Sequence, residues 1–179
     1  MVKLIVNSDE LKWIYERLCA EIVEKNKGLE NTALVGIRTR GVYIADRLKK
    51  IFNEKFKVNV PRGILDITLY RDDLSISTHY PEVKSTEINF PIDNKNIILV
   101  DDVIYTGRTV RAAIDAIMDI GRPKSIQLCV LVDRGHRELP IQPDFVGKKI
   151  QTSKKERIHV KVKEYDGSDE IYISQNTKL

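Results

Sequence analysis

The stretch ILVDDVIYTGRTV, residues 98–110, limits the possible folds more than any other part of the chain. An apolar run leads directly into Asp101 and Asp102, and a short turn containing Gly107 then opens a helical pattern. An apolar run of this kind indicates a buried strand. Carboxylates are costly to bury unless cations or hydroxyl groups surround them. The segment therefore predicts a strand–turn–helix unit with a polar ligand site where the strand ends.

Similar units recur along the chain. Apolar runs predict strands at 32–37, 58–70, 96–100 and 125–132, and helical spacing predicts helices at 42–52, at 108–120 and between an N-cap at Ser8 and a C-cap at Gly28. Apolar strands that alternate with helices are typical of an α/β fold with a parallel sheet covered on both faces. Ligands of such sheets bind beyond the carboxyl ends of the strands. The polar residues that follow the strands should therefore meet at one site.

The composition agrees with one domain and excludes few functions. With 179 residues, 42% of them hydrophobic, the chain can form one core, and we expect residues 1–179 to be a single domain. The apolar runs are too short for a membrane span, and the first residues do not resemble a signal peptide. Cys19 and Cys129 fall at apolar positions, which predicts buried free thiols in a reducing, cytoplasmic compartment. A net charge of +4 permits anionic partners but does not require them.

The turn after the acidic pair has the composition of a phosphate site. Backbone N–H groups at a helix start, together with the hydroxyls of Thr106 and Thr109, can surround a phosphate, and Gly107 allows close approach. The vicinal hydroxyls of a ribose can donate to Asp101 and Asp102. One phosphorylated ribose would satisfy both features. For an isolated acidic pair, a strand end beside an acidic helix cap is the alternative.

ILVDDVIYTGRT resembles the phosphoribosyl pyrophosphate motif of type I phosphoribosyltransferases. The segments VGIRTRGVYIADRL, DITLYRDDLS, VLVDRGHRELPI and DFVGKKIQTSK are similar, in order and spacing, to the bacterial regulators of pyrimidine-operon attenuation that are also uracil phosphoribosyltransferases. The resemblance spans about residues 8–173 and implies a type I phosphoribosyltransferase-like parallel sheet flanked by helices, with a lid or hood. It implies a cytoplasmic, Mg²⁺-dependent enzyme that makes UMP and pyrophosphate from uracil and phosphoribosyl pyrophosphate. It also implies a transcription-attenuation regulator that binds the leader mRNA of the pyrimidine operon more tightly with UMP or UTP.

The resemblance further implies roles for individual residues. Catalysis would involve Asp101, Asp102 and Arg40. The 5′-phosphate would be bound by Val103, Ile104, Tyr105, Thr106, Gly107, Arg108 and Thr109. Pyrophosphate would be bound by Arg38, Thr39, Arg40, Gly41 and Arg71, and the base by Val132, Asp133 and Arg134. Residues 71–94 would form a flexible lid, with a disordered insertion as the alternative. Mg²⁺ would be held mostly by substrate and water, without dedicated protein ligands.

The family likeness also implies an RNA-binding face. Its expected members are Arg17, Thr39, His136, Arg137, Lys148 and Thr152. The chain departs from the family at four further positions of that face, where similar members carry basic, hydroxyl or histidine residues: Trp13, Glu16, Ala20 and Gln142. These departures bear on RNA affinity and sequence preference rather than on the fold.

Two other functions stay open at this point. The chain could be an enzyme alone, salvaging uracil or a purine, since PDFVG also resembles the hypoxanthine-guanine enzymes. Those enzymes usually carry an acid in the phosphate loop where this chain has Tyr105, which favours uracil. A regulator that binds nucleotides without catalysis is the third hypothesis, and the intact site segments argue against it. In each case we expect a homo-oligomer, a dimer or larger.

Overall fold

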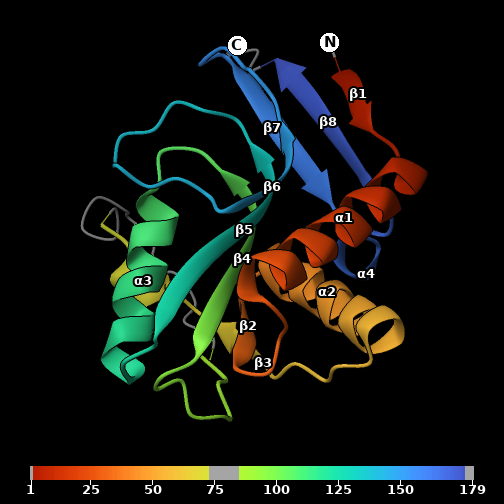
Figure 1. Cartoon of the computed structure of the whole chain (residues 1–179). Coiled ribbons are helices and arrows are strands. Elements are labelled where there is room, and N and C mark those ends of the chain that lie inside the picture. Colours follow the sequence, from red (N-terminus) through yellow and green to blue (C-terminus); the bar gives the residue numbers. More distant parts are fainter. Residues whose placement is uncertain (1, 73–84, 176–179) are drawn as a thin grey trace.

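The computed structural model describes residues 2–72 and 85–175. Figure 1 shows the order of the elements along the chain. They are β1 (Val2–Val6), α1 (Ser8–Asn26), β2 (Thr32–Ile37), α2 (Arg40–Phe56), β3 (Arg62–Leu65), the 3₁₀ helix η1 (Thr68–Tyr70), β4 (Asn96–Ile104), α3 (Arg108–Ile120), β5 (Ser125–Asp133), β6 (Phe145–Lys149), β7 (Glu156–Lys161), α4 (Lys163–Asp166) and β8 (Glu170–Gln175).

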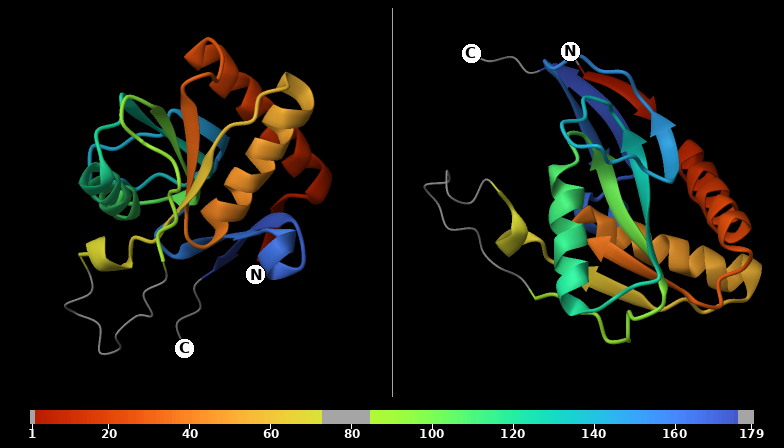
Figure 2. Two further views of the ribbon diagram at one scale, coloured as in Figure 1. Left: turned by 90° about the horizontal axis from the view of Figure 1, so that it is seen from below. Right: turned by 60° about the vertical axis from the view of Figure 1, so that its left-hand side comes forward.

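A five-stranded parallel sheet in the order β3-β2-β4-β5-β6 forms the centre of the molecule. Helices α1 and α2 cover one face and α3 covers the other, as Figures 1 and 2 show. Side chains alternate between the two layers along each strand: Leu34 packs with α1 and α2, whereas Val35 packs on the side of α3. The predicted α/β architecture, with helices on both faces of a parallel sheet, is therefore confirmed.

A smaller antiparallel sheet combines the first strand of the chain with its last two strands. Its order is β1-β8-β7, with Leu4 opposite Tyr172 and Tyr172 opposite His159. We call residues 2–6 and 156–175 the hood. The apolar face of the hood, which includes Val160 and Ile171, joins the core layer of α1 and α2. This packing holds the hood beside the carboxyl edge of the central sheet.

Several predicted boundaries are wrong in detail. The N-cap of α1 is Asn7, whose side chain accepts from the backbone N–H groups of Asp9 and Glu10, and not Ser8. The helix ends at Lys27 in the left-handed conformation, one residue before the expected Gly28. The strand expected over 58–70 is only the four residues of β3, because its pairing with β2 ends where β2 itself ends.

The predicted lid, residues 71–94, falls partly outside the described residues, which omit 73–84. Its return segment lies against the body of the protein. Glu87 and Ile64 exchange backbone hydrogen bonds of 2.8 Å beside β3, and Ile92 is buried in the core layer of α3. Residues 85–92 therefore anchor the returning chain, and the role of a lid stays a prediction.

Candidate functional site

A cavity of about 390 Å³ lies at the carboxyl edge of the central sheet. Several separate chain segments line it: the β2–α2 turn, the segment after β3, the end of β4 and the start of α3. The lining residues are Ile37, Arg38, Thr39, Arg40, Asp66, Ile67, Thr68, Arg71, Asp101, Asp102, Val103 and Thr109. The cavity thus brings together all three residues expected in catalysis with most of those expected to bind pyrophosphate.

The acidic pair lies within β4 at the floor of this cavity. Asp101 is only 7% exposed, and its carboxylate accepts a 2.9 Å hydrogen bond from the backbone N–H of Asp102. Asp102 in turn accepts from the N–H of Val103 at 2.7 Å. Burial, and then the neighbouring Asp102 charge, raise the pKa of Asp101 well above its usual range. Burial also raises the pKa of Asp102, while the Val103 N–H and the nearby Arg40 counteract that rise.

The β2–α2 turn holds the predicted pyrophosphate residues. The peptide bond between Arg38 and Thr39 is cis. A side chain at Gly41 would collide with the carbonyl oxygen of Val100 in β4, so only glycine allows this turn to lie directly beside the acidic pair. Arg38 donates to the carbonyl oxygen of Ser85 at 2.9 Å, which connects the turn to the returning segment 85–92.

The predicted phosphate loop is divided between the cavity and its rim. Val103 and Thr109 line the cavity, whereas Tyr105, Thr106, Gly107 and Arg108 do not. Gly107 has a φ of 94° at the start of α3, a conformation that side chains disfavour. The first N–H groups of α3 therefore begin directly beside the cavity, as an anion site at a helix start requires.

The predicted base loop begins at the end of β5 and lies outside this cavity. Its residues Val132, Asp133 and Arg134 do not line it. The Arg134 guanidinium is buried, lies 4.1 Å from the centre of the Tyr105 ring and donates to the carbonyl oxygen of Glu156 at 2.9 Å. Arg134 thus connects the phosphate loop to the hood, with its side chain engaged inside the protein.

Three of the expected RNA-binding residues cluster at that loop. The ring of His136 contacts the carbonyl oxygen of Thr152 at 2.5 Å, and His136 itself is exposed. Arg137 has a side chain only 12% exposed, pairs with Asp133 at 2.7 Å and donates to the carbonyl oxygen of Tyr105 at 2.9 Å. The contacts of Arg137 are internal, so its first effect is to hold the loop. Thr39, the fourth expected RNA residue, lines the catalytic cavity instead.

Arg17 and Lys148, the remaining expected RNA residues, lie together at a separate groove between α1 and β6. Trp13, which is 68% exposed, lines the same groove. Arg17 donates to the carbonyl oxygens of Val146 and Gly147, at 3.2 and 2.5 Å. This arrangement brings an exposed aromatic ring and two cationic residues into the lining of one surface groove.

Sequence reasoning missed two sets of residues near the cavity. Asp66, Ile67 and Thr68 line it because β3 ends early and turns into η1. Asp166 of the hood reaches Arg40, and these two residues also line a neighbouring cavity of about 270 Å³ with Asp102, Ile158, His159, Val160, Lys161 and Tyr172. Asp66, the acidic residue in LDITLY, could have indicated the first set as part of the site. The residues next to Asp166 in the sequence do not indicate that Arg40 is its partner.

The described residues contain no cluster of three or more His, Cys, Asp or Glu side chains suited to a metal ion. Within the same residues, none of the helices combines the length and the apolar character that a membrane crossing demands.

Cys19 and Cys129 are buried free thiols, as the sequence predicts, and burial raises the pKa of Cys19 to about 12.

Comparison with known proteins identifies the family of the chain. The phosphoribosyl transferase domain model matches residues 2–166. A hypoxanthine-guanine phosphoribosyltransferase from Bacillus anthracis has the same fold, with a TM-score of 0.69 at 21% identity over 97% of each chain. A hypoxanthine phosphoribosyltransferase from Trypanosoma cruzi has a TM-score of 0.73 at 17% identity, covering 97% of this chain and 91% of that one. The chain is a member of the phosphoribosyltransferase domain family.

Relatives with higher sequence identity show to which group of phosphoribosyltransferase-domain proteins the chain belongs. The bifunctional protein PyrR of Caldicellulosiruptor bescii is 55% identical over 173 residues, which are 97% of this chain and 95% of the relative. Those of Limosilactobacillus fermentum and Halalkalibacterium halodurans are 56% and 50% identical, over 96% and 99% of this chain and 97% and 99% of the relatives. The chain therefore belongs to the bifunctional PyrR family.

Proposed function

We propose that this protein transfers the phosphoribosyl group of phosphoribosyl pyrophosphate to uracil, which gives UMP and pyrophosphate, and that it binds the pyrimidine-operon leader mRNA in response to uridine nucleotides. The observation that supports the transfer best is the acidic pair of the buried Asp101 and the half-buried Asp102 beside the start of α3. A ribose hydroxyl and a phosphate together match this combination of acceptors and N–H donors.

The chain's own residues would bind and orient rather than form a covalent intermediate. Asp101 and Asp102 would accept hydrogen bonds from the ribose hydroxyls, and their charge would offset the positive charge that develops on the ring as the bond to pyrophosphate breaks. Arg38 and the N–H groups of its turn would attract the leaving pyrophosphate. Backbone groups near Val132 would position uracil, so that its N1 approaches C1′ as pyrophosphate departs.

Mg²⁺ fits the donor set of this cavity. Asp66, Asp101 and Asp102 contribute carboxylate oxygens to the lining, and Thr68 adds a hydroxyl. Oxygen ligands, including water, are those that Mg²⁺ prefers. We propose that substrate phosphates and water provide most of its ligands, and that carboxylates of the lining accept hydrogen bonds from that water. When bound, Mg²⁺ would neutralise charge on the departing pyrophosphate.

The regulatory half of the proposal concerns two surfaces. One holds His136 and Thr152 at the base loop, and the other holds Arg17 and Lys148 beside Trp13. A symmetric dimer would repeat each surface and present both to one RNA hairpin, which is why we propose a homo-oligomer. The buried free thiols Cys19 and Cys129 support a cytoplasmic location, because such thiols persist in reducing compartments.

A pair of measurements tests the proposal. Labelled uracil and phosphoribosyl pyrophosphate should give UMP in the presence of Mg²⁺, and hypoxanthine or guanine should react far more slowly. Leader RNA should bind more tightly when UMP is added, and by reciprocity RNA should tighten UMP binding by the same factor. Turnover without RNA binding would indicate an enzyme alone. RNA binding without turnover would indicate a regulator that has lost catalysis.

A further inference from the structure

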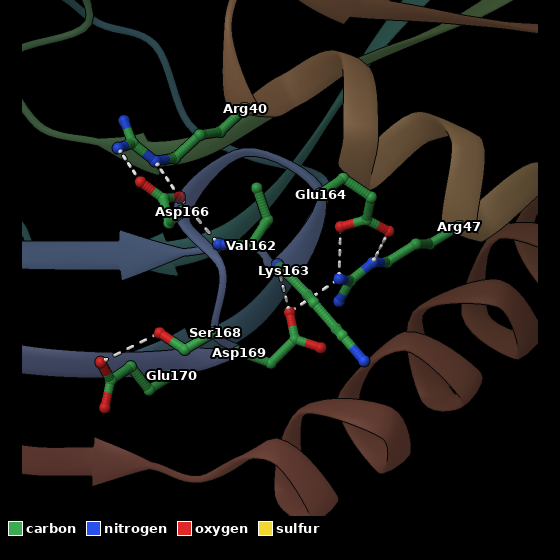
Figure 3. Close-up of polar contacts among 9 residues, drawn as sticks. All are labelled: Arg40, Arg47, Val162, Lys163, Glu164, Asp166, Ser168, Asp169 and Glu170. Carbon is green, nitrogen blue, oxygen red and sulfur yellow. Dashed lines mark hydrogen bonds and ion pairs between the residues drawn. The ribbon is translucent and has the colours of Figure 1, made fainter.

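An ion pair connects the hood to the catalytic cavity. Arg40, the first residue of α2, donates from Nε and Nη2 to the two carboxylate oxygens of Asp166, at 3.0 and 2.7 Å. Figure 3 shows this two-pronged contact and the other nitrogen of the guanidinium, which points away from Asp166. Asp166 is the last residue of α4, in the connection between β7 and β8. The pair therefore joins residues that are 126 positions apart.

Arg40 occupies a wall shared by two cavities. It lines both the 390 Å³ cavity and the neighbouring 270 Å³ cavity, and Asp102 does the same. Of the three arginines that line the larger cavity, Arg38, Arg40 and Arg71, Arg40 also lines the smaller one, beside Asp102. Its placement decides whether the Asp102 carboxylate stays accessible or becomes covered by a guanidinium.

Asp166 is itself firmly held. Its side chain is only 13% exposed, and it accepts a 2.9 Å hydrogen bond from the backbone N–H of Val162. The same connection is fixed to α2 at a second point, where Arg47 contacts Glu164 at 2.5 Å and Asp169 at 2.7 Å. An acceptor held this way can fix a guanidinium in one orientation, because a bidentate contact restricts rotation as well as position.

We infer that Asp166 is a positioning residue for transfer: it holds Arg40 at the cavity wall, with one face of the guanidinium presented to the pyrophosphate and the Asp102 carboxylate left open for the ribose. This inference rests on the proposed transferase function and adds a residue to it. Asp166 does not touch substrate; it acts through Arg40. Without Asp166, Arg40 gains freedom to turn toward the half-buried Asp102 carboxylate, whose charge attracts it, and to cover the ribose site.

The test is a kinetic comparison of Asp166→Asn with Asp169→Asn. Both changes remove one carboxylate charge from the same connection, but Asp169 contacts Arg47 and the N–H of Lys163, away from both cavities. Losing a charge-assisted contact should raise the KM for phosphoribosyl pyrophosphate about tenfold in Asp166→Asn. The KM for uracil should stay near the wild-type value. Asp169→Asn leaves the contact between Arg47 and Glu164 in place, so it should change both constants far less than Asp166→Asn changes the KM for phosphoribosyl pyrophosphate.

Arg40→Lys provides an independent arm, which does not depend on the folding of Asp166→Asn. Lysine keeps the charge but cannot make the two-pronged contact, so it should raise the same KM. Combining it with Asp166→Asn should add little, because both changes disrupt one interaction. Asp166→Glu should recover part of the loss, since it retains the carboxylate.

The outcomes separate the hypotheses. A wild-type protein that makes no UMP overturns the proposed function. If the wild type is active, equal effects of Asp166→Asn and Asp169→Asn on both KM values would mean that Asp166 only stabilises the hood. A wild-type KM for phosphoribosyl pyrophosphate in Arg40→Lys, or full additivity of the double variant, would also overturn the inference.

Discussion

Replacing Asp101 with asparagine should make the folded protein more stable while it strongly slows catalysis. The Asp101 carboxylate is almost fully buried, and no ion pair reaches it among the described residues. Its hydrogen bond from the Asp102 N–H would survive in Asp101→Asn, because the amide oxygen can accept it. The change thus removes a buried charge and keeps the local bond.

The magnitude follows from that geometry. Relief of a buried, uncompensated polar penalty is worth about 1–3 kcal/mol in the free energy of unfolding. For a chain of this size each kcal/mol shifts Tm by about 2–4 °C. Loss of a group that stabilises developing charge should reduce kcat by about 100-fold or more. Stability and activity should therefore change in opposite directions at one residue.

The pH dependence gives the sign of the effect. The folded-state pKa of Asp101 is raised, so the folded protein holds this proton more tightly than the unfolded chain does. The associated stability is fully present below the unfolded pKa of about 3.9 and is lost as pH rises through the folded-state pKa. The advantage of Asp101→Asn should accordingly be small near pH 4 and large near pH 8.

Urea unfolding followed by circular dichroism at both pH values measures this difference. The control is Asp115→Asn, which removes an exposed acid that pairs with Arg111 one helical turn away. That variant should change stability by less than about 0.5 kcal/mol at either pH. The reasoning fails if Asp101→Asn is no more stable than wild type near pH 8, or if its advantage is the same at both pH values.

Other predictions concern the loops and the RNA surfaces. Replacing Thr106 and Thr109 together by alanine should weaken UMP and phosphoribosyl pyrophosphate binding by similar factors in calorimetry, because both ligands carry the 5′-phosphate; a loss confined to one ligand contradicts this. His136→Ala should reduce leader-RNA affinity, with a salt slope shallower by roughly one unit if a phosphate contact is lost, and leave uracil turnover near wild type. Arg137→Ala should reduce both leader-RNA affinity and uracil turnover, because the pairing of Arg137 with Asp133 holds the base loop. Normal turnover in that variant would refute this role of Arg137 in holding the loop. RNA should quench the fluorescence of Trp13, the single tryptophan in the chain, since it lies exposed in the groove that Arg17 and Lys148 also line, and an unchanged spectrum at saturating RNA would remove this groove from the RNA face.

Three central strands, β2, β4 and β5, were predictable from the sequence because their signals are local, whereas β6 was not predicted. Continuous apolar runs indicated β2, β4 and β5. These strands are buried on both faces of the sheet, so most of their residues are apolar. The acidic pair and the turn before α3 were visible for the same reason, since they are contiguous in the chain. The early end of β3 was missed, because it depends on where the neighbouring strand stops rather than on residues 62–70 themselves.

Long-range pairings could not be predicted from one sequence. Nothing near Arg40 indicates that its partner is Asp166, and nothing near Arg137 indicates that its charge is used internally by Asp133. Both arginines sit in basic segments that are typical of exposed anion-binding loops. Only the three-dimensional fold determines whether such a guanidinium can bind a ligand or already forms an ion pair with a carboxylate of the protein.

The hood has a consequence for the order in which the protein acquires activity. Its middle strand, β8, lies between β1 and β7, so residues 2–6 find their strand partner only after residues 170–175 have been synthesised. The central sheet uses pairings between segments that leave the ribosome much closer together. A nascent chain can thus assemble the acidic pair and the phosphate loop while the connection that carries Asp166 is still being made. Pairing β1 with β8 closes a loop of most of the chain, which is a late folding event. The contact between Asp166 and Arg40 would therefore form last, as the final step that prepares the cavity.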